Sequence, residues 1–165
     1  MFRSCKYPEP VITPMIDICH IGPKGLELIK KYEGYRGVAY RCPAGVWTVG
    51  YGHTNGVTKA TTCNEAQAES WLLEDVAFAE AAVTEAAIPA LNQNQFDALV
   101  SFVFNVGSGN FRRSTLLRIA KIDSQDARIE KGFLQWNKAK VDGVLVPLPG
   151  LTQRRKEEAQ LYFSR

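Results

Sequence analysis

The greatest concentration of side chains capable of acid–base or nucleophilic chemistry lies between residues 32 and 54. Glu33 falls at the predicted C-terminal end of a helix, where the helix macrodipole is negative and disfavours an ionised carboxylate. A carboxyl group that stays protonated near neutral pH is what a general acid requires. Glu33 alone would fit a surface residue of a last helical turn equally well, so its interpretation depends on its neighbours.

Cys42 and Thr48 supply those neighbours. Eight residues separate Glu33 from Cys42, five separate Cys42 from Thr48, and the segment Gly50-Tyr51-Gly52-His53-Thr54 follows. This arrangement resembles the active-site segment of glycoside hydrolase family 24, the phage endolysins similar to the T-even phage lysozymes. The resemblance extends over about residues 23–164 and leaves residues 1–22 without a counterpart.

The resemblance implies a muramidase that cleaves bacterial peptidoglycan. Glu33 would protonate the glycosidic oxygen of the β-1,4 bond between N-acetylmuramic acid and N-acetylglucosamine, through an oxocarbenium-like transition state. Thr48 would hold the attacking water, and Cys42 occupies the family's second catalytic position. The resemblance also implies contacts with the saccharide at Gly52, Thr54, Phe104, Asn105 and Ser114.

Cys42 stands where Asp is the alternative residue of the family. A thiol with its ordinary pKa of about 8.5 is mostly neutral at pH 7, whereas Asp is ionised. Cys42 could act as a thiolate or as a nucleophile, so inversion and a covalent intermediate both stay open. The four cysteines, Cys5, Cys19, Cys42 and Cys63, allow three pairings. We expect free thiols, with a disulfide that blocks Cys42 as the alternative.

His53 is interpreted as a structural residue. A histidine in a Gly-x-Gly-His turn could serve as a catalytic base, but it more often fixes the turn by pairing with a carboxylate. Asp75 lies where the family carries an acidic residue facing this histidine, so the resemblance implies a His53–Asp75 ion pair between hairpin and helix.

The hydrophobic periodicity predicts the elements that position these residues. A first helix over about residues 23–32 would begin at Pro23 and end before Gly34. Two alternating segments, 38–42 and 47–51, flank a turn at 43–45 and predict a β-hairpin. Helices are expected over about 62–87, beginning with a capping box at Thr62, and over 93–106, 114–122, 124–138 and 151–163. Residues 142–149 are expected to form a loop.

This order predicts an α+β fold that is mostly helical. A small N-terminal lobe with the hairpin would be joined by a long helix to a helical C-terminal lobe, with a cleft between the lobes. Residues 1–22 would form an irregular extension, and residues 23–165 one lysozyme-like catalytic domain of two lobes.

Composition narrows the function classes. The chain has 165 residues and a net charge of +3, a mildly basic balance that suits an anionic cell wall and gives little support to nucleic-acid binding. Two histidines and no Cys-x2-Cys pair predict no metal or cofactor. The Pro-rich residues 1–22 resemble neither a secretory signal nor a membrane anchor. We therefore expect a monomer that accumulates in the host cytoplasm and reaches the wall through a holin-type pore.

Two other activities compete with the muramidase prediction. A lytic transglycosylase would use Glu33 alone and form an anhydro-sugar, but a water-positioning Thr48 would then be unnecessary. A non-catalytic wall-binding relative is suggested only by the missing Asp, and the presence of Glu33 and Thr48 weighs against it.

Overall fold

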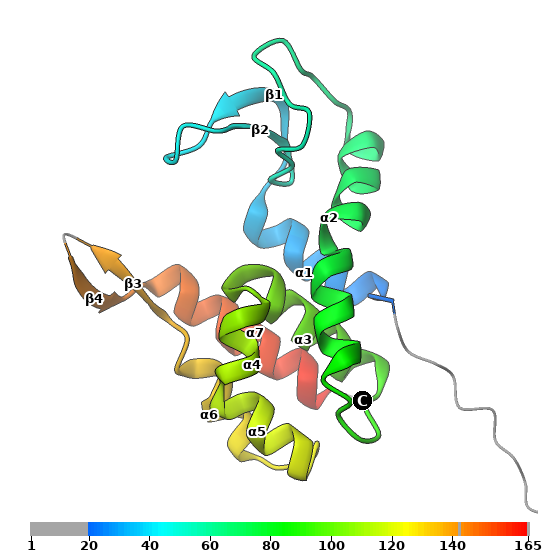
Figure 1. The fold of residues 1–165 in the computed structure, drawn as a ribbon, viewed down its shortest axis with the longest axis vertical. Coiled ribbons are helices and arrows are strands. Elements are labelled where there is room, and N and C mark those ends of the chain that lie inside the picture. The colour runs from blue at the N-terminus through cyan, green and yellow to red at the C-terminus, as the bar shows by residue number, and fades with distance from the viewer. Residues whose placement is uncertain (1–19, 142, 165) are drawn as a thin grey trace, which may run out of the picture.

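The computed structural model describes residues 20–141 and 143–164 (Figure 1). Within these ranges the chain forms helices and two small antiparallel hairpins, as the sequence predicts for a mostly helical α+β fold. In chain order the elements are α1 (Pro23–Glu33), β1 (Arg36–Arg41), β2 (Trp47–Gly50), α2 (Glu65–Glu85), α3 (Gln93–Val106), α4 (Ser108–Arg113), α5 (Thr115–Ile122), α6 (Arg128–Leu134), β3 (Lys138–Val141), β4 (Val144–Pro147) and α7 (Pro149–Phe163).

Helix α1 ends at Glu33, because Gly34 adopts a positive φ of 70° and its N–H donates to the Lys30 carbonyl at 3.0 Å. At the other end, no side chain of its own caps the helix. Asp97 of α3 does so instead: its carboxylate accepts hydrogen bonds from the N–H groups of Gly22 at 2.7 Å and Gly25 at 3.1 Å. The N-terminus of α1 is therefore tied to α3.

Gly25 is the residue that permits this close approach. A Cβ atom at position 25 would lie 2.8 Å from the Cβ of Asp97 and 2.6 Å from Cγ1 of Ile21. Helix α1 thus packs on α3 and α7, so the last residue of α1 is held beside the C-terminal helices as well as beside the first hairpin.

Strands β1 and β2 form the predicted hairpin. Tyr40 pairs with Thr48 and Arg41 with Trp47, and Gly45 takes a positive φ of 80° in the turn between the strands. The register shifts between Arg36 and Tyr40. The hairpin stands beside the first half of α2, which continues down to the helical end of the molecule (Figure 1).

The predicted capping box at Thr62 is wrong. Asn64 caps α2, and its side-chain oxygen accepts from the N–H of Gln67 at 2.8 Å. Thr62 instead forms an isolated antiparallel bridge with Val38. The requirement to extend the hairpin therefore keeps Thr62 out of the helix, which starts at Glu65.

Helix α3 occupies the centre of the C-terminal helices and keeps the predicted bounds. It packs against α1, α2, α4 and α7, and every residue from Gln95 to Val103 is buried. Phe102 meets three aromatic rings edge to face at 5.4–6.4 Å, namely those of Phe111, Phe133 and Trp136. This aromatic cluster joins α3 to α4 and α6, and the burial of its rings supplies a large part of the apolar driving force for folding.

The segment 124–149 departs from the sequence prediction. The expected helix over 124–138 is shorter, α6, and Lys138–Val141 pairs with Val144–Pro147 in a second hairpin that replaces the expected loop. Gly143, with a φ of 83°, follows Asp142, and an Asp-Gly dipeptide favours such a two-residue turn. Helix α4, only six residues long, was not expected either, because it is too short for a helical period to stand out.

Of residues 1–22, the predicted irregular extension, the structure describes only the last three. The Ile21 N–H donates to Oε1 of Glu80 at 2.7 Å, and the rest of that prediction lies outside the described residues. Across residues 20–141 and 143–164, no helix has the length and apolar character needed to cross a membrane.

We predict that Asp97→Ala will lower the free energy of unfolding by about 1–3 kcal/mol, because the N–H groups of Gly22 and Gly25 lose their acceptor. Chemical denaturation monitored by circular dichroism measures this. Glu85→Gln is the matched control, since its exposed pair with Arg112 at 2.9 Å should contribute less than about 1 kcal/mol. Equal effects of the two variants would contradict the assigned role of Asp97.

Candidate active site

Glu33 lies at the junction of α1 with the first hairpin, and its side chain is 27% exposed. Its Oε1 atom accepts a hydrogen bond from Nη1 of Arg154 on α7 at 2.8 Å. The side chain of Arg154 is only 4% exposed. The carboxyl group that the sequence places at an electrostatically unfavourable helix end therefore also faces a buried cation, which sequence reasoning missed.

Arg154 belongs to a group of charged and polar side chains, buried except for the partly exposed Glu33, that we call the arginine network: Glu33, Arg154, Arg155, Glu158 and Ser101. Nε of Arg154 donates to Oε1 of Glu158 at 3.2 Å, and Nη2 of Arg155 donates to the same oxygen at 2.8 Å. The Ser101 hydroxyl of α3 also donates to this oxygen, at 2.9 Å. Glu158 and Arg155 are fully buried, so each depends on the other for compensation of its charge.

Burial has opposite effects on the two charges of this pair. It lowers the pKa of Arg155 and raises the pKa of Glu158. The guanidinium groups of Arg155 and Arg154 and the Ser101 hydroxyl oppose the rise at Glu158. The Arg155 guanidinium also lies 5.1 Å from the Phe102 ring centroid, which gives it an aromatic face in place of water.

Tyr32 and the pair Lys31–Glu157 form further contacts between α1 and α7, beside Arg154. Arg154 lies 5.3 Å from the Tyr32 ring centroid. Burial, with Glu157 as the next cause, raises the pKa of Tyr32 to about 12, so its phenol is neutral at physiological pH. Nζ of Lys31 lies 2.7 Å from Oε1 of Glu157.

Cys42 and Thr48 are brought together where the hairpin turns. The Cys42 N–H donates to the Val46 carbonyl at 3.0 Å, and the Thr48 hydroxyl donates to the same carbonyl at 3.2 Å. The backbone of Val46 lowers the pKa of Cys42, burial opposes this, and the backbone of Ala44 and the Thr48 side chain add to the lowering. The site therefore favours a thiolate more than an ordinary cysteine does.

Thr48 is 4% exposed. Its O–H is donated to the Val46 carbonyl or, when Cys42 is a thiolate, to the sulfur, which is the form that the Thr48 contact favours. In either case the oxygen lone pairs of Thr48 can accept from a water molecule.

His53 and Asp75 form the expected pair. Nδ1 of His53 lies 2.9 Å from Oδ2 of Asp75 on α2, and Nε2 lies 3.0 Å from the carbonyl of Asn55. The imidazole also stacks on Trp71, with ring centroids 4.8 Å apart. Both nitrogens are thus occupied and the ring is buried, an arrangement that fixes the segment after β2 to α2.

The residues expected to contact saccharide are distributed over three places. Gly52 and Thr54 are exposed on either side of His53. Phe104 is half-buried and Asn105 exposed at the end of α3, one helical turn beyond Ser101. Ser114 is only 2% exposed, because its hydroxyl oxygen caps α5 by accepting from the Leu117 N–H at 3.0 Å. The structure thus places Ser114 in a helix cap, where its side chain is not free to meet a ligand.

Cys42 and Cys63 are free thiols in the structure, and Cys5 and Cys19 lie outside the described residues. Among residues 20–141 and 143–164, no three His, Cys, Asp or Glu side chains are arranged to hold a metal ion.

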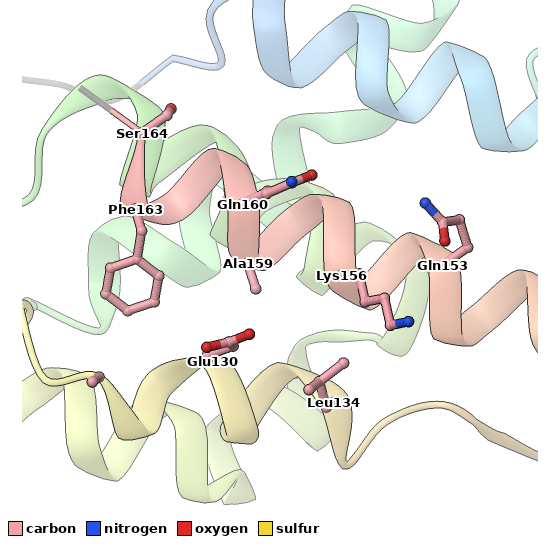
Figure 2. A pocket seen from close by; sticks show the side chains of 9 residues that line it. Glu130, Leu134, Gln153, Lys156, Ala159, Gln160, Phe163 and Ser164 are labelled. Atoms are coloured by element: carbon pink, nitrogen blue, oxygen red, sulfur yellow. The ribbon is translucent and has the colours of Figure 1, made fainter.

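A groove of about 680 Å³ lies between α6 and α7 (Figure 2). Lys156, Gln160 and Phe163 line it from α7, and Glu130 and Leu134 from α6. Helical periodicity places Lys156 and Gln160 on the side of α7 opposite to Arg154. The groove is therefore separate from the surroundings of Glu33.

Comparisons with known proteins agree on one family. The family model described as phage lysozyme matches residues 30–158. The endolysin of Acyrthosiphon pisum secondary endosymbiont phage 1 is 48% identical over 147 residues, which cover 88% of this chain and 99% of that relative.

Two solved structures share the fold. The muramidase domain of SpmX from Asticaccaulis excentricus aligns with a TM-score of 0.82 at 35% identity, covering 88% of this chain and 99% of that one. The endolysin from Escherichia coli O157:H7 phage FAHEc1 aligns with a TM-score of 0.81 at 36% identity, covering 87% and 93%. The lysozyme-like fold expected from the sequence is thereby confirmed.

We predict that the alkylation of Cys42 by iodoacetamide will reach half its maximal rate at a lower pH than that of an unperturbed thiol. The contacts at the turn lower the pKa of Cys42, and the thiolate is the reactive form. Peptide mass spectrometry after timed labelling follows Cys42 separately from the other cysteines. A midpoint pH of alkylation at or above that of an ordinary thiol would contradict the lowered pKa of Cys42.

We predict that Asp75→Asn will destabilise the protein by about 1–3 kcal/mol, since it weakens the hydrogen bond to a buried imidazole. A double-mutant cycle with His53→Asn, read from Trp fluorescence during urea unfolding, isolates the coupling between the two residues. Additive effects of the two substitutions would show that the pair does not stabilise the junction of hairpin and helix.

Proposed function

The chain belongs to the phage lysozyme family, and from that premise we propose how it acts as a phage lysis enzyme on peptidoglycan. The bond we assign is the β-1,4 linkage between N-acetylmuramic acid and N-acetylglucosamine, cleaved by hydrolysis. The observation that carries this assignment is the juncture of α1 and the first hairpin, where Glu33 ends the helix and Cys42 and Thr48 follow at the hairpin turn.

Glu33 is the proposed general acid. The glycosidic C–O bond breaks, its electron pair passes to the leaving oxygen, and that oxygen takes the proton of Glu33. The side chain is partly exposed, so the carboxyl group is open to substrate. Its Oε1 atom is held by Arg154, which leaves Oε2 for the glycosidic oxygen.

Cys42 and Thr48 are proposed to act on the water. Thr48 would position the water through its free lone pairs, and the water oxygen would bond to the anomeric carbon. Its proton would pass to the Cys42 thiolate, whose formation the lowered pKa favours. Exchange with solvent then restores the proton on Glu33 and removes it from Cys42. This direct attack inverts the anomeric configuration, whereas attack by the Cys42 sulfur would retain it.

Gly52, Thr54, Phe104 and Asn105 are proposed to contact the glycan around this centre. The enzyme is proposed to work as a monomer without a cofactor and to reach the wall through a holin-type pore. Exposed cations beside aromatic rings on the hairpin support an affinity for an anionic polymer: Arg41 lies 5.1 Å from the Trp47 ring centroid.

We predict that Glu33→Gln will lower the rate of cell-wall clearing by about 10²–10⁴-fold, because Gln cannot donate the proton. Turbidity of a peptidoglycan suspension measures the rate. Glu27→Gln is the matched control, being an exposed carboxylate on the same helix that should leave clearing unchanged. Full activity in Glu33→Gln would remove Glu33 from the mechanism.

Products distinguish the mechanisms at Cys42. We expect reducing ends without anhydro-muramic acid in mass spectra, and initial formation of the inverted anomer in NMR spectra. Cys42→Asp should clear the suspension, because a carboxylate can also accept the proton, whereas Cys42→Ala should be slower by about 10²-fold. A product that keeps the anomeric configuration, together with an inactive Cys42→Asp variant, would contradict direct attack by water. It would show that the Cys42 sulfur forms a covalent intermediate.

A further inference from the structure

Arg154 lies between two carboxylates that face it from different helices. Its Nη1 atom is 2.8 Å from Oε1 of Glu33 on α1, and its Nε atom is 3.2 Å from Oε1 of Glu158, one turn further along α7. The guanidinium is buried and covers Tyr32. A single buried cation is therefore shared between the proposed acid and a carboxylate that cannot reach substrate.

We propose that Arg154 is a positioning residue for Glu33, and that Glu158 limits how strongly Arg154 holds the ionised form of that acid. This inference rests on the proposed role of Glu33 as general acid. It concerns two residues that do not touch the glycan and that act on the reaction only through Glu33.

Contacts on two sides hold the guanidinium of Arg154 in one place. Its Nη2 atom lies 3.5 Å from the carbonyl of Ser101 on α3, and its Nε atom is held by Glu158. Since α7 and α3 pack closely, the guanidinium has a fixed place in the core. A contact of Nη1 with one carboxylate oxygen then fixes the direction of the Glu33 side chain, and misplacement of a catalytic group by about 1 Å can cost about 10²-fold in rate.

Glu33 must carry a proton to act as a general acid. A neighbouring guanidinium favours an ionised carboxylate, which is the form that cannot act as an acid. Glu158 opposes this effect because its own negative charge lies against the same guanidinium. Within the arginine network two cations face two carboxylates, so removal of either Arg154 or Glu158 changes the balance at Glu33 in opposite directions.

Among the described residues, the charged or titratable side chains that contact Arg154 or its neighbours on α1, α3 and α7 are paired or neutral. On α1 and α7, Lys31 is paired with Glu157 and Tyr32 is a neutral phenol. On α3 the facing group is Ser101, which carries no charge. In the Cys42→Asp background used below, the first hairpin contributes the same carboxylate to every variant. The substitutions below therefore change mainly the contact between Arg154 and Glu33.

The test is the pH profile of kcat/KM for peptidoglycan hydrolysis, measured in the Cys42→Asp background. There the base is a carboxylate, so the alkaline limb reports loss of the proton from Glu33 and not the titration of a thiol. We expect Arg154→Gln to move the midpoint of this limb upward by about one pH unit and to reduce the maximal rate. Arg154→Lys keeps a positive charge but not the two-sided geometry. It should therefore keep the limb near its wild-type position and still lose rate.

The role of Glu158 is tested by removing its charge together with the charge of its partner Arg155. The double variant Arg155→Met with Glu158→Leu replaces a buried ion pair by apolar side chains, an exchange that is often tolerated. Arg154 is then left with Glu33 alone, and we expect the alkaline limb to move downward. Lys156→Gln is the matched control: it removes one positive charge from the neighbouring position of α7 but faces the groove of Figure 2, so the limb should not move.

Opposite shifts in Arg154→Gln and in the double variant support the inference. An unmoved limb in either folded variant, or a shift of the same size in Lys156→Gln, overturns it. If Arg154→Gln fails to fold, the double variant and Arg154→Lys decide by the same criteria. Failure of the proposed function is a separate result, because Glu33→Gln would then remain active whatever the profiles of the other variants.

Discussion

The ion pair between Glu33 and Arg154 is the contact on which the arrangement of the site depends. A guanidinium that is withdrawn from water pays a large desolvation penalty unless anions and hydrogen-bond acceptors surround it. Arg154 meets this requirement with Glu33, Glu158 and the Ser101 carbonyl. These three groups come from α1, α7 and α3, so the cation that holds the proposed acid is fixed by contacts with all three helices.

The first hairpin depends on a second set of contacts. Its strands are short, and a two-stranded hairpin alone is barely stable in water. The hairpin is extended by the Val38–Thr62 bridge and fixed to α2 by His53 and Asp75. Gly34 ends α1 and leads directly into β1, so Cys42 and Thr48 are carried on an element held at both ends. The site is thus assembled from one helix end anchored in the core and one hairpin anchored to α2.

Much of this arrangement could be predicted from local sequence patterns. Helix α3 has the bounds that its apolar period and Gly107 indicate, and α1 ends within one residue of its expected end. The spacing of Glu33, Cys42 and Thr48 could be read from the sequence, whereas the pairing of His53 with Asp75 was predicted only through the family resemblance. Long-range contacts could not be predicted in this way, because Glu33 and Arg154 are 121 residues apart. Of the contacts of Arg154, only the one with Glu158 is suggested by sequence spacing, since the two residues lie one turn apart on the same helix. The hairpin of β3 and β4 was missed because its strands are short and exposed, although Asp142-Gly143 carries the turn pattern. Thr62 was misassigned because a bridge to a distant strand overrode a local capping motif.

The central claim is that Glu33 delivers the proton to the glycosidic oxygen. It is tested most directly by a crystal structure of Glu33→Gln, which should bind the glycan without cleaving it, in complex with a peptidoglycan oligosaccharide. We expect the amide of residue 33 to lie within hydrogen-bond distance of the oxygen that joins N-acetylmuramic acid to N-acetylglucosamine, with Cys42 and Thr48 on the far side of the anomeric carbon. A glycan bound away from residue 33, for example in the groove between α6 and α7, would contradict it.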